Sequence, residues 1–225
     1  MLRTKLRKIF PYINKQVVKE KKNQIDDEDP LNVDSLATTV RYKPECLDHL
    51  CQTTKFTKKE LQIMYRGFKQ ECPSGIVKED TFKEIYAQFF PQGDSNLYAH
   101  YVFNVFDQDR DGTVSFEEFV SGLSILARGD NHDKLLWAFS LYDLNRDGMI
   151  TRDELFDIVI SVYDLIGSCS EPVGDEVSTA RDHVDRIFKK MDTDNDGVIT
   201  IHEFIQACEK DDSISKSLNV FDTVL

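Results

Sequence analysis

The stretch DQDRDGTVSFEE, from Asp107 to Glu118, decides the fold, because the chain repeats it twice more. DLNRDGMITRDE begins at Asp143 and DTDNDGVITIHE begins at Asp192, and the three segments align without a gap. Each begins with aspartate, carries glycine at its sixth position and ends with glutamate at its twelfth. Self-similarity of this kind predicts a chain built from several copies of one supersecondary unit.

All three segments, here called loops 2, 3 and 4, fit the EF-hand pattern D-x-[DN]-x-[DN]-G-x5-E. Calcium takes about six to eight oxygen ligands, and such a loop supplies them from positions 1, 3, 5, 7, 9 and 12. Position 7 acts through its backbone carbonyl and position 9 often through a water. The predicted ligands are Asp107, Asp109, Asp111, Thr113, Ser115 and Glu118 in loop 2, Asp143, Asn145, Asp147, Met149, Thr151 and Glu154 in loop 3, and Asp192, Asp194, Asp196, Val198, Thr200 and Glu203 in loop 4.

The residue types at the other positions agree with this interpretation. A glutamate at position 12 can ligate through both oxygens, which suits the wide calcium shell better than the tight magnesium shell. We therefore expect three calcium sites, which magnesium could occupy at low calcium. The glycines at position 6 are expected at positive φ, and the apolar residues at position 8 are expected in short β-bridges between paired loops. These residues are Gly112, Gly148 and Gly197, and Val114, Ile150 and Ile199.

A fourth, altered copy precedes the other three. Aligning Gly75 with position 6 puts Gln70 at position 1 and Thr81 at position 12, and Pro73 falls inside the loop. No ligand position of this copy then holds a carboxylate, so we expect the first hand to bind no calcium. Val77 still fills position 8, which predicts that the hand is kept as the structural partner of loop 2.

The segments around the loops have the spacing of helices. A capping box, Thr57 to Glu60, opens the first of them. Further helices are predicted at about 79–90, 95–106, 116–127, 132–142, 152–166, 179–191 and 201–209, and residues 167–179 are interpreted as an exposed loop. Because a single hand cannot cover its apolar face, hands 1 and 2 should pair, as should hands 3 and 4.

The sequence thus predicts an all-α EF-hand fold with two paired-hand lobes. The predicted organisation is a variable tail at 1–41, one lobe at 42–128, a second at 129–212 and an amphipathic C-terminal helix at 213–225. Gly129 favours a bent link that sets the lobes side by side. The C-terminal helix either stays docked on its own lobe or acts as a plug that a target helix displaces.

Aromatic residues crowd the first lobe, and most of them are expected in the core. Opened EF-hand pairs also expose an apolar groove that takes an amphipathic helix. The predicted groove residues are Phe56, Tyr65, Phe68, Tyr86, Phe89, Phe90, Tyr101, Phe106 and Trp137.

Composition narrows the function further. The net charge of −12 over 225 residues argues against nucleic-acid binding, which depends on basic side chains. Residues 1–22, in contrast, hold eight basic residues and one acid, and either form a solvated tail or contact anionic lipid or a partner. Five irregularly spaced cysteines and no apolar leader predict a cytoplasmic protein with reduced thiols. No nucleophile–base grouping suggests an enzyme.

Four stretches carry a resemblance to a known family: KPECLDHLCQTTKFTKKELQIMYRGFKQECPSG (43–75), EIYAQFFPQGDSNLYAHYVFNVFD (84–107), LSILARGDNHDKLLWAFSLYD (123–143) and KSLNVFDTVL (216–225). On these residues the chain resembles the neuronal calcium sensor family, and within it the potassium-channel-interacting proteins. The resemblance implies an auxiliary subunit at the cytoplasmic face of the plasma membrane. Such a subunit holds the N-terminal segment of a tetrameric A-type (Shal-type) voltage-gated potassium channel in its groove.

Three other functions remain open on the sequence. One is a calsenilin-like transcriptional repressor released by calcium, and another is a frequenin- or recoverin-like kinase regulator. The third is a passive calcium buffer, which would bind no apolar helix.

Overall fold

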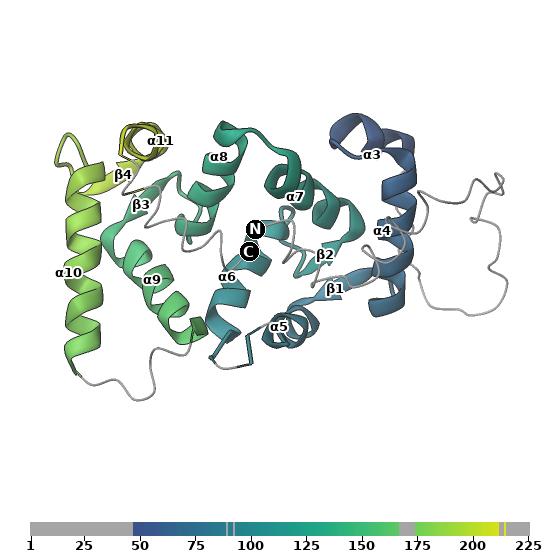
Figure 1. The fold of residues 1–225 in the computed structure, drawn as a ribbon, viewed down its shortest axis with the longest axis horizontal. Coiled ribbons are helices and arrows are strands. Elements are labelled where there is room, and N and C mark those ends of the chain that lie inside the picture. The colour runs from purple at the N-terminus through teal and green to yellow at the C-terminus, as the bar shows by residue number, and fades with distance from the viewer. Residues whose placement is uncertain (1–46, 89, 92, 167–173, 212–213, 215–225) are drawn as a thin grey trace, which may run out of the picture.

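The computed structural model describes residues 47–88, 90–91, 93–166, 174–211 and 214, with the backbone alone at 166 and 174–179. The elements follow one another along the chain (Figure 1) as α3 (Leu47–Thr53), α4 (Lys58–Glu71), β1 (Ile76–Lys78), α5 (Glu79–Ala87), α6 (Asn96–Phe106), β2 (Thr113–Ser115), α7 (Phe116–Arg128), α8 (Asn131–Tyr142), β3 (Met149–Thr151), α9 (Arg152–Ile166), α10 (Gly174–Met191), β4 (Val198–Thr200) and α11 (Ile201–Lys210). This is the predicted all-α EF-hand fold. The predicted tail and all of the predicted C-terminal helix except Ile214 lie outside the described residues.

Two antiparallel strand pairs join the loops two by two, as predicted. β1 pairs with β2 through Val77 and Val114, and β3 pairs with β4 through Ile150 and Ile199. All four side chains are buried, so position 8 of each hand anchors the loops in the core. β1 and β2 lie towards the α4 end of the molecule and β3 and β4 towards the α10 end (Figure 1).

The glutamate that ends loop 2 or loop 4 is the third residue of the helix that follows it. Ser115 caps α7 by accepting a hydrogen bond from the Glu118 N–H, while the Glu118 carboxylate accepts from the Ser115 N–H. Thr200 and Glu203 form the same reciprocal pair at α11. The predicted box at Thr57 is also present. Two otherwise unpaired donors are satisfied at each helix start, which fixes where the helix begins.

Two helix boundaries differ from the sequence prediction by more than one residue. α5 ends at Ala87 instead of residue 90, because the residue before Pro91 is disfavoured in the α region. α10 begins at Gly174, so the predicted loop at 167–179 is wrong for its last six residues. The acids that follow Gly174 in the sequence suit the positive end of a helix dipole. α3 was not predicted at all, since seven residues are too few for a clear apolar period.

The two lobes lie against each other. α7 ends at Arg128, and Gly129 leaves the helical region with φ −59° and ψ 152°, so that α8 starts in a new direction. Asp94, in the turn before α6, donates its N–H to the Asp164 carbonyl of α9 at 2.9 Å. A Cβ on the neighbouring Gly93 would lie 2.2 Å from the Leu165 carbonyl oxygen, so only glycine permits this approach.

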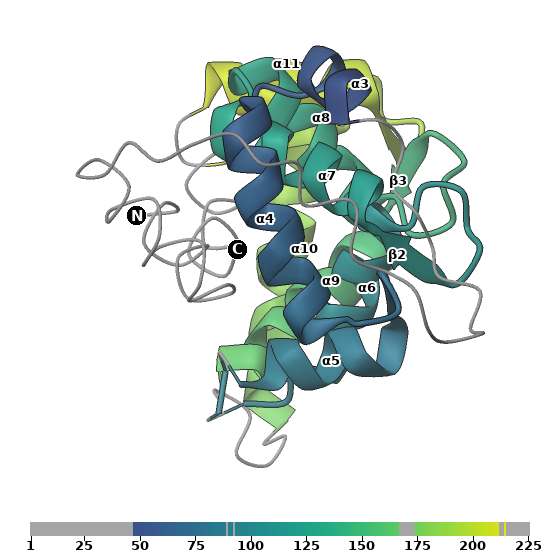
Figure 2. The same cartoon turned by 90° about the vertical axis from the view of Figure 1, so that its right-hand side faces the viewer.

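One apolar core runs through the described residues of both lobes. The Phe106 and Trp137 rings meet edge-on across the lobe boundary with their centroids 6.2 Å apart. In a view turned by 90° (Figure 2), α4 stands in front with α7 at its side and α5 at its lower end. Among the described residues, no helix combines the length and the apolar character needed to span a membrane.

Candidate metal centres

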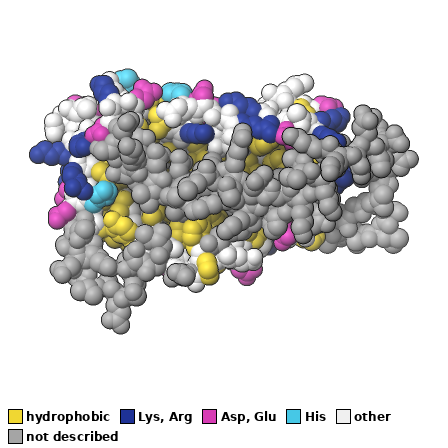
Figure 3. Space-filling view, viewed as in Figure 1, with side chains coloured by type: hydrophobic (Ala, Val, Ile, Leu, Met, Phe, Trp, Pro, Cys, Tyr) yellow, Lys and Arg dark blue, Asp and Glu magenta, His cyan; other side chains and the backbone are white. Residues whose placement is uncertain are grey.

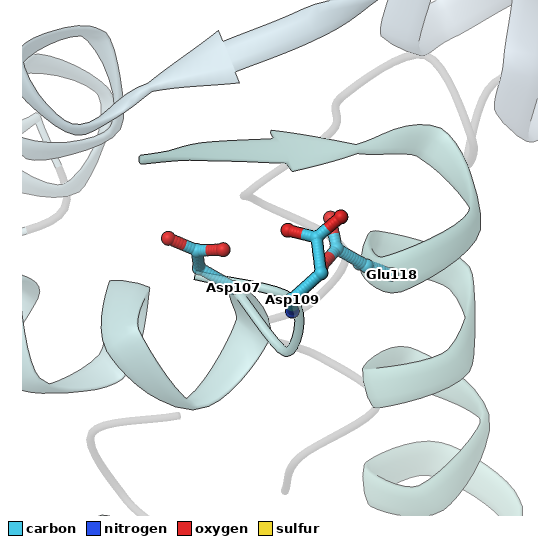
Figure 4. Close-up of side chains that lie close together, drawn as sticks. All are labelled: Asp107, Asp109 and Glu118. Carbon is cyan, nitrogen blue, oxygen red and sulfur yellow. Dashed lines mark hydrogen bonds between the residues drawn. The ribbon is translucent and has the colours of Figure 1, made fainter. Parts of the chain in front are cut away.

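Loop 2 brings its acidic side chains together at the end of α6. Asp107 is buried, and its two carboxylate oxygens accept the N–H groups of Asp111 at 3.2 Å and Gly112 at 3.0 Å. These bonds wrap the loop around the first carboxylate. Figure 4 shows Asp107 at the helix end, Asp109 in the loop and Glu118 arriving from α7. One oxygen from each of these three lies within 4.8 Å of the others, close enough to share one cation.

Loop 3 has the same wrapping, with one amide among its predicted ligands. Asp143 accepts the N–H groups of Asp147 at 3.1 Å and Gly148 at 2.9 Å. Asn145 stands at position 3, where its Nδ2 donates to Asp147 at 3.0 Å. An amide oxygen is a neutral calcium ligand, so this loop offers one negative charge fewer than its neighbours.

Loop 4 shows most directly that its residues fit a cation. Asp192, Asp194 and Asp196 each offer an oxygen within 4.8 Å of the others. Asp192 is buried; its Oδ2 accepts the Gly197 N–H at 3.2 Å, but its Oδ1 has no hydrogen-bond partner. A carboxylate oxygen buried without a partner is costly. The residues present therefore fit a calcium ion, which Asp192 would hold together with the other predicted ligands of this loop.

The carboxylates at position 12 are already directed into their loops. Glu203 is 7% exposed and accepts hydrogen bonds from the N–H and hydroxyl groups of both Thr193 and Thr200, at 2.8 to 3.0 Å. Burial alone would raise the pKa of Glu203, but these four bonds outweigh it and lower the pKa to about 2. The carboxylate is thus kept ionised, as a calcium ligand must be.

In loops 2 and 3, the pKa of the position 1 carboxylate is shifted in the opposite direction, upwards. Burial raises the pKa of Asp107, and the nearby Glu118 carboxylate adds to the rise. Burial likewise raises the pKa of Asp143, with a contribution from the charges of Asp147 and Glu154. Crowded acids that resist ionisation are stabilised by a bound cation, which offsets their mutual repulsion.

The first hand keeps the backbone of a calcium loop without its ligands. Gly75 has a φ of 89°, as the glycines of the other three loops are at positive φ. Cys72 is buried at position 3, and burial raises the pKa of its thiol. Lys69, which directly precedes this loop, donates from its ammonium group to the Pro73 carbonyl at 2.7 Å, so a lysine side chain contacts a carbonyl of the loop. This geometry supports the prediction of a partner hand.

A second left-handed position in each of loops 2, 3 and 4 was not predicted from the sequence. Arg110, Arg146 and Asn195 stand at position 4 with φ between 58° and 61°. Such values are uncommon for residues other than glycine. The fixed spacing from the position 1 aspartate was the only signal that could have identified them.

The predicted groove residues fall into two groups. Phe68, Tyr86, Phe106 and Trp137 are buried, at 1 to 7% exposure, whereas Phe56, Tyr65, Phe90 and Tyr101 are half-buried. Phe89 lies outside the described residues. Figure 3 shows hydrophobic side chains gathered along the middle of one face of the molecule. The groove stays a prediction, and the half-buried group is the part of it that a partner could reach without a rearrangement.

Comparison with protein families agrees with this geometry. Residues 132–209 match the EF-hand domain pair, and residues 99–126 match the EF hand domain. The chain contains EF-hand domains. The matched ranges include loops 2, 3 and 4, and these domains support a calcium-binding regulatory protein.

Proposed function

We propose that this EF-hand protein is a calcium-dependent auxiliary subunit of an A-type (Shal-type) voltage-gated potassium channel. In this proposal it binds the cytoplasmic N-terminal segment of the tetrameric channel and is held at the plasma membrane through it. The observation that carries the proposal is the first hand, which has no carboxylate at any ligand position yet keeps its pairing through Val77 and Val114. A protein that only stored calcium would gain more from a first hand that also held an ion, whereas this hand contributes only its pairing and its apolar face.

The aromatic residues of the first lobe supply a surface for the channel segment. Tyr65 of α4 is half-buried and meets the buried Phe116 ring edge-on, with the centroids 5.0 Å apart. Aromatic side chains held in this way are the usual anchors of an apolar helix in a groove. Calcium supplies charge neutralisation in loop 2, and the residues of α7 transmit the resulting change in loop geometry to α4, against which α7 packs.

Co-expression with a Shal-type channel tests the proposal. Current density should rise and inactivation should change when the protein is present. Tyr65→Ala should weaken binding of a peptide from the channel's N-terminal segment by about fivefold or more, because truncating an aromatic anchor costs over about 1 kcal/mol. Tyr163→Ala is the matched control, since Tyr163 is also half-buried but lies on α9 and outside the predicted groove.

Two results would contradict the proposal. Unchanged current density and inactivation would exclude this channel class as the target. A failure of calcium to change apolar exposure, measured with a hydrophobic dye, would favour the passive buffer instead.

A further inference from the structure

Loop 2 has no calcium-binding partner within its own lobe. β3 and β4 join loops 3 and 4, both of which carry ligands, whereas β2 joins loop 2 to the first hand. The ligand positions of that hand hold no carboxylate. Communication between loop 2 and another calcium site therefore requires a contact across the lobe boundary.

Arg146 makes such a contact. This residue stands at position 4 of loop 3, and its Nη2 donates to the backbone carbonyl of Asp107, position 1 of loop 2, at 3.0 Å. The Arg146 backbone is left-handed, with φ 58°. Positive φ is uncommon for arginine, so the folded loop must hold the Arg146 backbone in this conformation. The backbone conformation in turn sets the direction in which the side chain extends from the loop.

The packing of α6 against α8 keeps the two loop starts close. Phe106, the last residue of α6, meets Trp137 of α8 across the boundary. Trp137, Asp143 and Arg146 line one cavity of about 400 Å³ in which Gln108 of loop 2 also takes part. Both loops thus meet at a single interlobe space.

We propose that Arg146 is a positioning residue that couples calcium binding at loop 3 to calcium binding at loop 2. Binding at loop 3 orders position 4, and the ordered arginine holds the Asp107 carbonyl where loop 2 begins. Part of the conformational entropy of loop 2 is then lost when the first ion binds loop 3. A second ion therefore has less of loop 2 to order and binds it more tightly. By linkage, an ion at loop 2 strengthens binding at loop 3 by the same factor.

The charge of Arg146 acts against this effect without reversing it. A guanidinium near loop 2 repels a calcium ion, but Arg146 is only half-buried and solvent screens the repulsion. The proposal concerns calcium binding alone and does not depend on the identity of the channel target.

A calorimetric experiment isolates the two loops. Glu203→Gln first disables loop 4, and the calcium affinity of loop 2 is then measured with loop 3 intact or disabled by Glu154→Gln. Trp137, the single tryptophan, lines the shared cavity and gives an independent fluorescence readout. The affinity of loop 2 should fall by about fivefold on disabling loop 3, the lower end of typical coupling between sites, because one half-exposed hydrogen bond carries it.

Arg146→Met should abolish that fivefold difference while leaving the intrinsic calcium affinity of loop 3, measured with loop 2 disabled by Glu118→Gln, unchanged, which a general structural defect would not do. Arg146→Gln, too short to reach Asp107, should do the same and serves if the methionine variant folds poorly. Arg110→Met is the matched control, because Arg110 has the same position and backbone in loop 2 but is exposed; the fivefold difference should persist. The proposal would be overturned if Glu154→Gln left the calcium affinity of loop 2 unchanged. It would also be overturned if the fivefold difference persisted in both Arg146 variants.

Discussion

Gly122→Ala tests the packing that places loop 2. A Cβ at Gly122 of α7 would lie 2.4 Å from Cε1 and 2.7 Å from Cδ1 of Phe106. The Phe106 ring is 5% exposed and packs against Phe119 and Trp137, with centroids 6.1 and 6.2 Å away. The ring can make room only by displacing these neighbours, and Phe106 directly precedes the first ligand of loop 2.

Two opposing effects determine how much Gly122→Ala changes the free energy of unfolding. Replacing glycine by alanine inside a helix gains about 1 kcal/mol of helix propensity. Forcing an extra methyl into a packed core costs about 1–3 kcal/mol. We therefore expect Gly122→Ala to lower the free energy of unfolding by about 1 kcal/mol, and also to weaken calcium binding at loop 2.

Urea unfolding of the calcium-free protein, followed by Trp137 fluorescence, measures the change. The control is the same substitution in a Phe106→Leu background, where the ring edge is gone and Gly122→Ala should become neutral or stabilising. An increase of about 1 kcal/mol in the original background would refute the reasoning, since helix propensity would then act alone.

Three further predictions concern individual side chains. Asp192→Asn should weaken calcium binding at loop 4 by about tenfold or more, since a charged ligand is lost. It should also raise the free energy of unfolding of the calcium-free protein by about 1 kcal/mol, because the partnerless buried Oδ1 no longer carries charge; weaker binding without this gain would contradict the assigned burial. Arg128→Met removes the ion pair with Glu60 and should cost about 0.5 kcal/mol at neutral pH in urea unfolding. Burial raises the pKa of Glu60, but hydrogen bonds from Arg128 and Thr57 lower it below its ordinary value of 4.5. Because the pKa of Glu60 is lower in the folded protein than in the unfolded chain, the ion pair stabilises the fold fully above pH 4.5, and this contribution is lost as the pH falls below 4.5 through the folded pKa. The cost of Arg128→Met should therefore shrink as the pH is lowered below 4.5, and a cost independent of pH would exclude the pair as its source. Thr81→Ala should leave the calcium stoichiometry unchanged in equilibrium dialysis, and a lost site would mean that the first hand binds metal.

The sequence predicted the loops and their pairing well because those features are local. A twelve-residue ligand spacing, a glycine at position 6 and an apolar residue at position 8 are all read within one segment. The positive φ of Gly112 and the bridge between Ile150 and Ile199 follow from the same short pattern. Capping boxes such as Thr57 with Glu60 fixed a helix start equally directly.

The contacts between lobes could not be predicted in this way. Arg146 reaches Asp107 across 39 positions of sequence, and Gly93 meets the end of α9 from still farther away. Neither contact leaves a periodic or compositional signal. The missing partner of Asp192 Oδ1 is also invisible in the sequence, because it depends on which donors the folded loop brings within reach.

The number of calcium ions bound per chain tests the central claim most directly. Calorimetric titration of the calcium-free protein should find three tight sites, and Glu203→Gln should leave two, with loops 2 and 3 still filled. Three tight sites after Glu203→Gln, or a fourth site in the unaltered chain, would contradict the assignment of ligands to loops 2, 3 and 4.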